Sequence, residues 1–180
     1  MRRVRYSVAA SLDGFIADPG GGYDWIIMDE SIDFSAIFAE FDTFVMGRKT
    51  WDVSAHAETS ETAPLEDMFG GKDVIVFSRT LKTSPRPGVR IVNTSPADTV
   101  RELKQKPGKD IWLFGGGSMF RTLVDAGLVD TVEVAIMPVL LSQGVPLLAP
   151  GGRVTGMKLD KCETLPNSGI VMLSYTIPHA

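Results

Sequence analysis

Residues 115–118, three glycines followed by a serine, form the segment whose residue types best suit ligand binding. They follow an apolar run at 110–114 that predicts a buried strand, and they precede apolar residues at helical spacing. Ser118 is expected to cap that helix. A strand that passes through bare backbone into a helix N-terminus offers amides and a favourable dipole to an anion, and glycine lets a phosphate approach. The segment favours a phosphate site; a tight turn without a ligand is the alternative.

Composition limits the kinds of partner that we expect. The chain has 180 residues, 44% of them hydrophobic, which suits one domain over residues 1–180. The net charge is −4 and no basic stripe is present, so no nucleic-acid partner is expected. No leader-like or membrane-spanning apolar stretch occurs, so we expect a cytoplasmic protein without a membrane partner. A single cysteine, Cys162, and two histidines make a His/Cys metal site unexpected.

Strands and helices are expected to alternate along most of the chain. We expect strands at 4–10, 43–46, 73–78, 90–93, 110–114, 131–137, 157–165 and 170–177, and helices at 32–41, just after Thr50, at 97–106 and at 118–126. Alternation favours a parallel sheet with helices on both faces. The turn residues at 165–169 predict that the last two strands form an antiparallel hairpin. The fold class is therefore α/β, with a mostly parallel, mixed sheet.

Four short segments come directly after expected strands. They are Ser-Leu-Asp-Gly-Phe-Ile-Ala at 11–17, Gly-Arg-Lys-Thr-Trp at 47–51, Ser-Arg-Thr at 78–80 and Gly-Gly-Gly-Ser at 115–118. Ligands of open α/β sheets bind at the carboxyl ends of the strands. We therefore expect these segments to meet at one ligand-binding edge.

In this order and spacing, the segments resemble the dihydrofolate reductase superfamily. The opening at 11–17 is most similar to the reductase domain of the bifunctional deaminase-reductase of riboflavin biosynthesis. The resemblance covers residues 4–148 and extends through the final hairpin. It implies a three-layer dihydrofolate reductase-like fold and a homodimer. It also implies hydride transfer from NADPH to a small-molecule substrate with a heterocyclic, imine or carbonyl group, most like 5-amino-6-(5-phosphoribosylamino)uracil.

The resemblance also implies which residues hold NADPH. Gly47 lets the backbone approach the cofactor, and Arg48 and Thr50 contact its pyrophosphate and adenosine half. Ser78 and Arg79 recognise the 2′-phosphate, which distinguishes NADP from NAD. The pyrophosphate is held by Gly115, Gly116, Gly117 and Ser118. The nicotinamide is lined by Ala10, Ile16 and Ala17, which are small and apolar as a water-excluding site requires.

The proton-handling residue is where the sequence departs from dihydrofolate reductases. These enzymes place one acid on the first helix after a tryptophan; here Asp33 is the nearest match after Trp25, and Asp29 is the alternative. Both acids can equally belong to a solvated helix start. Because the pterin-specific pattern is absent, the pyrimidine-reductase reading is favoured. Dihydrofolate reduction and a non-catalytic NADPH- or nucleotide-binding module are the alternatives, and the zinc signature of a deaminase is missing.

Overall fold

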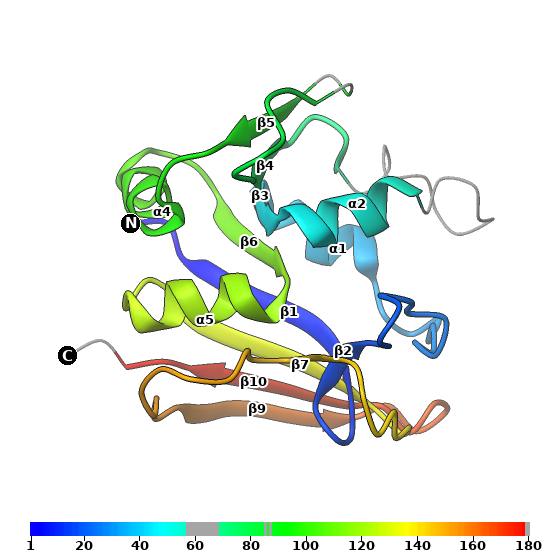
Figure 1. Ribbon diagram of the computed structural model, residues 1–180. Coiled ribbons are helices and arrows are strands. Elements are labelled where there is room, and N and C mark those ends of the chain that lie inside the picture. Colours follow the sequence, from blue (N-terminus) through cyan, green and yellow to red (C-terminus); the bar gives the residue numbers. More distant parts are fainter. Residues whose placement is uncertain (57–68, 85, 87, 179–180) are drawn as a thin grey trace.

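An eight-stranded mixed sheet forms the centre of the computed structural model, which describes residues 1–56, 69–84, 86 and 88–178 (Figure 1). Its strands are β1 (Val4–Ser11), β3 (Phe41–Gly47), β4 (Asp73–Phe77), β5 (Val89–Val92), β6 (Asp110–Gly115), β7 (Thr131–Met137), β9 (Lys158–Thr164) and β10 (Val171–Thr176). Their order is β5-β4-β3-β6-β1-β7-β10-β9. Neighbours from β5 to β7 are parallel, whereas β10 is antiparallel to β7 and β9. The predicted mixed sheet and C-terminal hairpin are confirmed.

Helices cover both faces of the sheet. They are α1 (Phe34–Ala39), α2 (Arg48–His56), α4 (Pro96–Gln105) and α5 (Gly117–Asp125). Successive residues of a strand face opposite sides, so β3 contributes to two cores. Val45 packs into the core that contains Leu103 of α4 and Leu123 of α5, whereas Phe44 packs with Trp51 of α2. This is the three-layer arrangement that the sequence predicts. None of the described helices is long and apolar enough to cross a bilayer.

The four described helices begin at 34, 48, 96 and 117, whereas the sequence predicts starts at 32, just after Thr50, at 97 and at 118; the first and the last of these differences have a local cause. The first helix begins at Phe34 and not at residue 32, because the Asp33 carboxylate accepts a hydrogen bond from the Ala36 amide at 2.9 Å and so caps it. The predicted capping role of Ser118 is wrong. Helix α5 begins at Gly117 with Gly116 as its N-cap, because the chain completes its turn within the glycines, and Ser118 is an exposed residue of the first turn.

A two-stranded ribbon that the sequence did not predict joins two loops at the carboxyl edge. It pairs β2 (Phe15–Ala17) with β8 (Val145–Pro146). The backbones are so close that a Cβ on Gly144 would lie 2.1 Å from the Ala17 carbonyl oxygen. Only glycine fits there, so the segment after β1 is fixed against the segment after β7.

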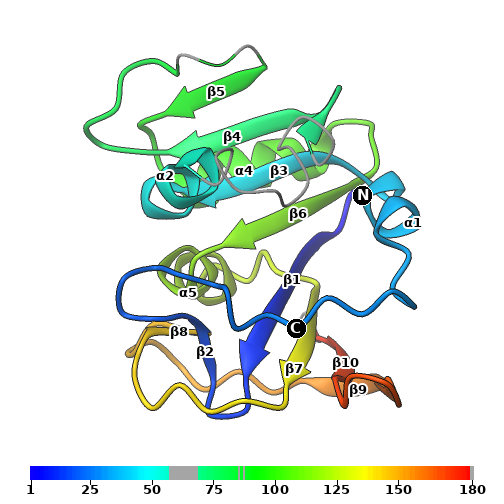
Figure 2. The same cartoon turned by 90° about the vertical axis from the view of Figure 1, so that its right-hand side faces the viewer.

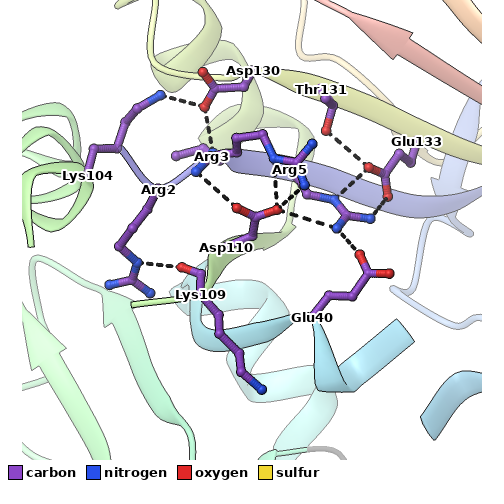
Figure 3. A network of polar contacts seen from close by, with 11 residues as sticks. Arg2, Arg3, Arg5, Glu40, Lys104, Lys109, Asp110, Asp130, Thr131 and Glu133 are labelled. Atoms are coloured by element: carbon purple, nitrogen blue, oxygen red, sulfur yellow. Dashed lines mark hydrogen bonds and ion pairs between the residues drawn. The ribbon is translucent and has the colours of Figure 1, made fainter. Parts of the chain in front are cut away.

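Ion pairs and hydrogen bonds fasten the amino-terminal edge of the sheet (Figure 3). Arg5 on β1 pairs with Glu133 of β7 and with Glu40. The Asp130 carboxylate accepts hydrogen bonds from the Val4 amide and from the Lys104 ammonium group of α4. These contacts fix β1 between its neighbours at the end opposite the predicted ligand edge.

Replacing Lys104 by alanine is expected to lower the free energy of unfolding by about 2–4 kcal/mol, because it removes one partner of a largely buried ion pair. The Lys104 side chain is only 8% exposed, and its ammonium group also donates to the Leu128 carbonyl. Urea unfolding measures the change. Arg101→Ala is the control on the same helix: its pair with Asp98 is exposed, so a loss below about 0.5 kcal/mol is expected. Equal losses for the two variants would contradict this account.

Candidate functional site

The carboxyl ends of four parallel strands meet at one edge of the sheet, in the order β4-β3-β6-β1. Figure 2 shows β1 and β7 running in the same direction towards the loops that join them to β2 and β8. The four segments singled out in the sequence follow these four strand ends. The prediction that they share one edge is confirmed.

The glycine turn between β6 and α5 lies against Thr50 of α2. Gly115 has φ +138°, a conformation that favours glycine, and its peptide bond to Gly116 is cis. Gly116 has φ −94°, which any residue adopts. A Cβ on Gly116 would lie 3.4 Å from the Thr50 Oγ1 atom and 3.9 Å from the Ile16 Cδ1 atom. The structure therefore brings together a glycine turn, a hydroxyl from α2 and an apolar side chain from β2.

The N-terminus of α5 carries no side-chain cap. The first turn is closed by the Met119 and Phe120 amides, which donate to the Gly116 carbonyl at 2.9 and 3.0 Å. Within the described residues, the Gly117 and Ser118 amides donate no hydrogen bond. Leading amides of a helix need a partner, and an anion is a favourable one. This helix start has the chemistry of an anion site.

Gly117 has a structural role of its own. It is buried, and a Cβ there would lie 2.2 Å from the Pro146 carbonyl oxygen and 3.1 Å from the Leu147 carbonyl oxygen. The Ala149 amide also donates to the Gly117 carbonyl at 3.2 Å. The segment after β7 thus packs on the start of α5, and glycine is required at position 117 whatever ligand binds.

Strand β3 passes directly into α2 at Gly47. A Cβ on Gly47 would only reach van der Waals distance of the Met119 Cε atom, at 4.0 Å, so space remains beside this backbone. Arg48 is the first residue of α2, and its Nε atom donates to both carboxylate oxygens of Asp52, at 2.6 and 2.7 Å. This ion pair holds the half-exposed guanidinium along α2, at the edge where the four segments meet.

After β4, Ser78 and Arg79 have different environments. Ser78 is buried, and its hydroxyl oxygen accepts from the Leu81 amide at 2.9 Å and from the Thr80 amide at 3.3 Å. This serine therefore closes the turn after the strand, and its hydroxyl proton remains available to another acceptor. Arg79 is exposed, and within the described part of the chain its guanidinium makes no hydrogen bond or ion pair.

Two features near this edge were not recognised in the sequence. Arg86 lies over the Trp51 ring, 5.6 Å from its centroid, and extends the group of cations that follows β4. Gly21 approaches α2 so closely that a Cβ would lie 3.2 Å from the Val53 Cγ2 atom. The signals were present as three cations within 79–86 and as a glycine run at 20–22, but no local pattern shows that both reach the same helix.

The three residues expected beside a nicotinamide ring differ in burial. Ala10 is fully buried in β1, where it pairs with Ile136 of β7. Ile16 and Ala17 are half-buried in β2. Only Ile16 of this group is shown to lie near the glycine turn. The apolar side chain of this group that lies at the glycine turn is therefore Ile16 of β2.

The two candidate acids have different roles in the structure. Asp29 is 7% exposed and accepts hydrogen bonds from the Ser31 amide and hydroxyl and, at 2.5 Å, from the Ser168 hydroxyl of the C-terminal hairpin. The Ser168 and Ser31 hydrogen bonds lower the pKa of Asp29 below its usual value. Asp33 is exposed and caps α1. Asp29 is thus ionised near neutral pH and joins a loop to the hairpin, whereas Asp33 contacts water.

No group of three or more His, Cys, Asp or Glu side chains in the described residues is arranged to hold a metal ion. A surface hollow of about 360 Å³ occurs at the amino-terminal edge, where Arg2, Asp42 and Lys106 are among its lining residues. It lies at the edge of the sheet opposite the glycine turn.

Comparison with known proteins gives relatives over nearly the whole chain. The uncharacterized protein YyaP of Bacillus subtilis is 34% identical over 179 residues, which cover 97% of this chain and 94% of that protein. A crystal structure of a putative riboflavin biosynthesis protein from Shewanella sp. PV-4 is 27% identical, with a TM-score of 0.81, and covers 99% of this chain and 100% of the other.

A more distant neighbour shares the fold. It is a diaminohydroxyphosphoribosylaminopyrimidine deaminase/5-amino-6-(5-phosphoribosylamino)uracil reductase from Thermotoga maritima, with 16% identity and a TM-score of 0.72. The match covers 98% of this chain and 57% of that one. The family model for the RibD C-terminal domain matches residues 2–171. The chain therefore belongs to the RibD C-terminal domain family.

Proposed function

We propose that this protein is an NADPH-dependent reductase that transfers a hydride to a small heterocyclic, imine or carbonyl substrate. The observation that carries the proposal is the uncapped start of α5, which meets Thr50 and Ile16 at the ligand edge of the sheet. Membership of the RibD C-terminal domain family supports a reductase of the type named for the Thermotoga maritima protein. We also propose that it is a homodimer, which the resemblance implies, and that it is cytoplasmic, which the sequence composition favours.

The residues at this edge fit the phosphates of the cofactor. The Gly117 and Ser118 amides, with the Thr50 hydroxyl and the Arg48 guanidinium, are donors suited to a pyrophosphate. Gly115 and Gly116 leave the turn without side chains, so the backbone can be approached closely. Beyond β4, the Ser78 hydroxyl and Arg79 suit a 2′-phosphate. When bound, NADPH supplies the hydride.

The residues on the other side of the glycine turn position the reacting groups. Ile16 and Ala17 form an apolar wall that excludes water from the ring of the cofactor. Asp29 acts as a positioning residue, because its hydrogen bond to Ser168 holds the loop before α1 against the hairpin. Asp33, which faces water, is the residue that we propose to pass a proton to the substrate. Asp29 is not given this role, because both of its carboxylate oxygens already accept hydrogen bonds, from Ser31 and from Ser168.

Arg79→Ala is expected to reduce the preference for NADPH over NADH by about 1–3 kcal/mol, because it removes a charge-assisted contact with the 2′-phosphate. NADH affinity should change little, since NADH has only a hydroxyl at this position. Titrations that follow tryptophan fluorescence measure both affinities. Arg101→Ala on α4 is the matched control and should leave both unchanged. Equal affinity of the unaltered protein for NADPH and NADH would refute the assignment of Ser78 and Arg79.

A further inference from the structure

The two halves of the ligand edge differ sharply in charge. Helix α2 and residues 78–86 carry one acid, Asp52, which pairs with Arg48, and five cations: Arg48, Lys49, Arg79, Lys82 and Arg86. The segments after β1 and β7 and around the hairpin turn carry none, since residues 6–47, 122–152 and 162–180 contain no lysine or arginine. In the proposed reductase the first half holds the cofactor phosphates. The substrate then binds at the second half, which lies beyond the glycine turn and consists of the segments after β1 and β7 and the hairpin turn.

The second half is rich in carboxylates. Residues 12–33, which connect β1 to α1, contain six acids, and residues 138–149 and 165–170 contain no charged side chain. An anionic substrate group placed there would meet like charge. Arg121 of α5 reaches the segment after β7, but its guanidinium already donates to the Asp125 carboxylate and to the Ala149 and Arg153 carbonyls. Like charges placed opposite each other weaken binding, so such a site disfavours phosphate esters.

Backbone amides do not replace the missing cations, because the carboxylates of this half already accept from them. Asp13 accepts from the Leu141 and Ser142 amides at 3.1 and 2.7 Å. Asp18 accepts from the Gly22 amide at 2.8 Å, and Asp29 accepts from the Ser31 amide at 2.9 Å. The start of α1 is likewise capped by Asp33. These four carboxylates accept from backbone amides that could otherwise donate to an anion, whereas the start of α5 has no such cap.

Exposed apolar side chains gather on the same loops. Leu12, Met28 and Leu140 are 67%, 67% and 68% exposed. The Leu12 amide donates to the Val139 carbonyl at 2.9 Å, so the loops that carry Leu12 and Leu140 lie side by side. Apolar surface with a few polar groups is typical of sites for uncharged rings.

We propose that the substrate reduced by this enzyme is a ring compound without a phosphate or other anionic group. The inference rests on the proposed reductase function and narrows its substrate class. It separates this chain from the activity named for the Thermotoga maritima protein, whose substrate carries a phosphoribosyl group. The reductase fold is retained, but the substrate half of the edge lacks the donors that a phosphate needs.

The test uses the full chain saturated with NADPH, so that the cofactor covers its own anion sites. Calorimetric titration with ribose 5-phosphate is expected to show no saturable binding up to about 10 mM. Leu140→Arg, which adds a guanidinium at this edge, is expected to bind ribose 5-phosphate measurably. Leu159→Arg, which adds the same charge on β9, is the matched control and is expected to behave like the unaltered protein. Submillimolar binding to the unaltered protein would overturn the proposal.

Turnover gives a second readout. With 5-amino-6-(5-phosphoribosylamino)uracil and its dephosphorylated form as probes, kcat/KM is expected to be at least about tenfold higher for the dephosphorylated compound. A preference for the phosphorylated compound would overturn the inference while leaving the reductase function intact. Failure of the protein to bind NADPH in the first step would instead refute the proposed function, and the substrate inference with it.

Discussion

Replacing Gly116 by valine is expected to weaken NADPH binding by about 30-fold or more, while the cofactor-free protein keeps nearly its full stability. The backbone of Gly116, with φ −94°, accepts valine, and its nearest neighbour, the Thr50 Oγ1 atom, lies 3.4 Å from the Cβ position. The added methyl groups nevertheless project from the glycine turn beside Thr50, next to the Gly117 and Ser118 amides where we place the pyrophosphate. Loss of one or two charge-assisted hydrogen bonds accounts for about 2 kcal/mol or more.

Gly117→Ala is the contrasting variant. Its Cβ would lie 2.2 Å from the Pro146 carbonyl oxygen, so the segment after β7 must move away from α5. We therefore expect Gly117→Ala to lower the melting temperature of the cofactor-free protein and Gly116→Val to leave it within about 1–2 °C. Fluorescence titration and thermal unfolding separate the two effects. Normal NADPH binding by Gly116→Val would show that the glycines serve the fold alone.

Asp29→Ala is expected to lower turnover by about 10- to 100-fold, because loss of the anchor between the loop and the hairpin misplaces the substrate by a fraction of an ångström or more. The variant removes the acceptor of the Ser31 and Ser168 hydrogen bonds. NADPH affinity should be retained, since Asp29 shares no hydrogen bond with the glycine turn among the described residues. Steady-state kinetics and cofactor titration measure the two quantities.

Asp29→Asn distinguishes positioning from proton transfer. The amide has the same shape, and the Ser168 hydroxyl can accept from it, so most of the activity should return. The hydrogen bonds lower the pKa of Asp29 in the folded protein relative to the unfolded chain, so ionised Asp29 stabilises the fold fully at any pH above the usual carboxyl range. This stabilisation is lost only as the pH falls through the lowered pKa of the folded state. Activity should therefore show no Asp29-dependent change near neutral pH. A neutral-pH transition that disappears in Asp29→Asn would make Asp29 a proton donor.

The order of layers, and the edge of the sheet at which the four segments meet, could be predicted from the sequence because local patterns encode them. The run at 110–114, followed by glycines and helical spacing, predicts a strand, a turn and a helix, and β6 and α5 occur there. Alternation in β3 places Val45 and Phe44 in opposite cores, as strand geometry requires. Every strand expected from the sequence occurs, and the expected bounds differ by at most two residues at either end.

The details that the sequence could not predict are contacts between distant segments. Asp29 gains its buried position from Ser168, 139 residues away, so nothing in its local surroundings distinguishes it from Asp33. The ribbon of β2 and β8 is too short to show a periodic pattern. The N-cap of α5 is Gly116, and not Ser118 as the sequence predicts. Gly117, the first residue of the helix, packs against the Pro146 backbone, which is a contact between distant segments.

A crystal structure of the protein grown with NADPH tests the central claim most directly. The account predicts that the pyrophosphate lies within hydrogen-bonding distance of the Gly117 and Ser118 amides, beside Thr50, with the 2′-phosphate next to Arg79. The nicotinamide ring should lie against Ile16. A cofactor bound at another edge of the sheet, or a pyrophosphate that makes no contact with the start of α5, would contradict the account.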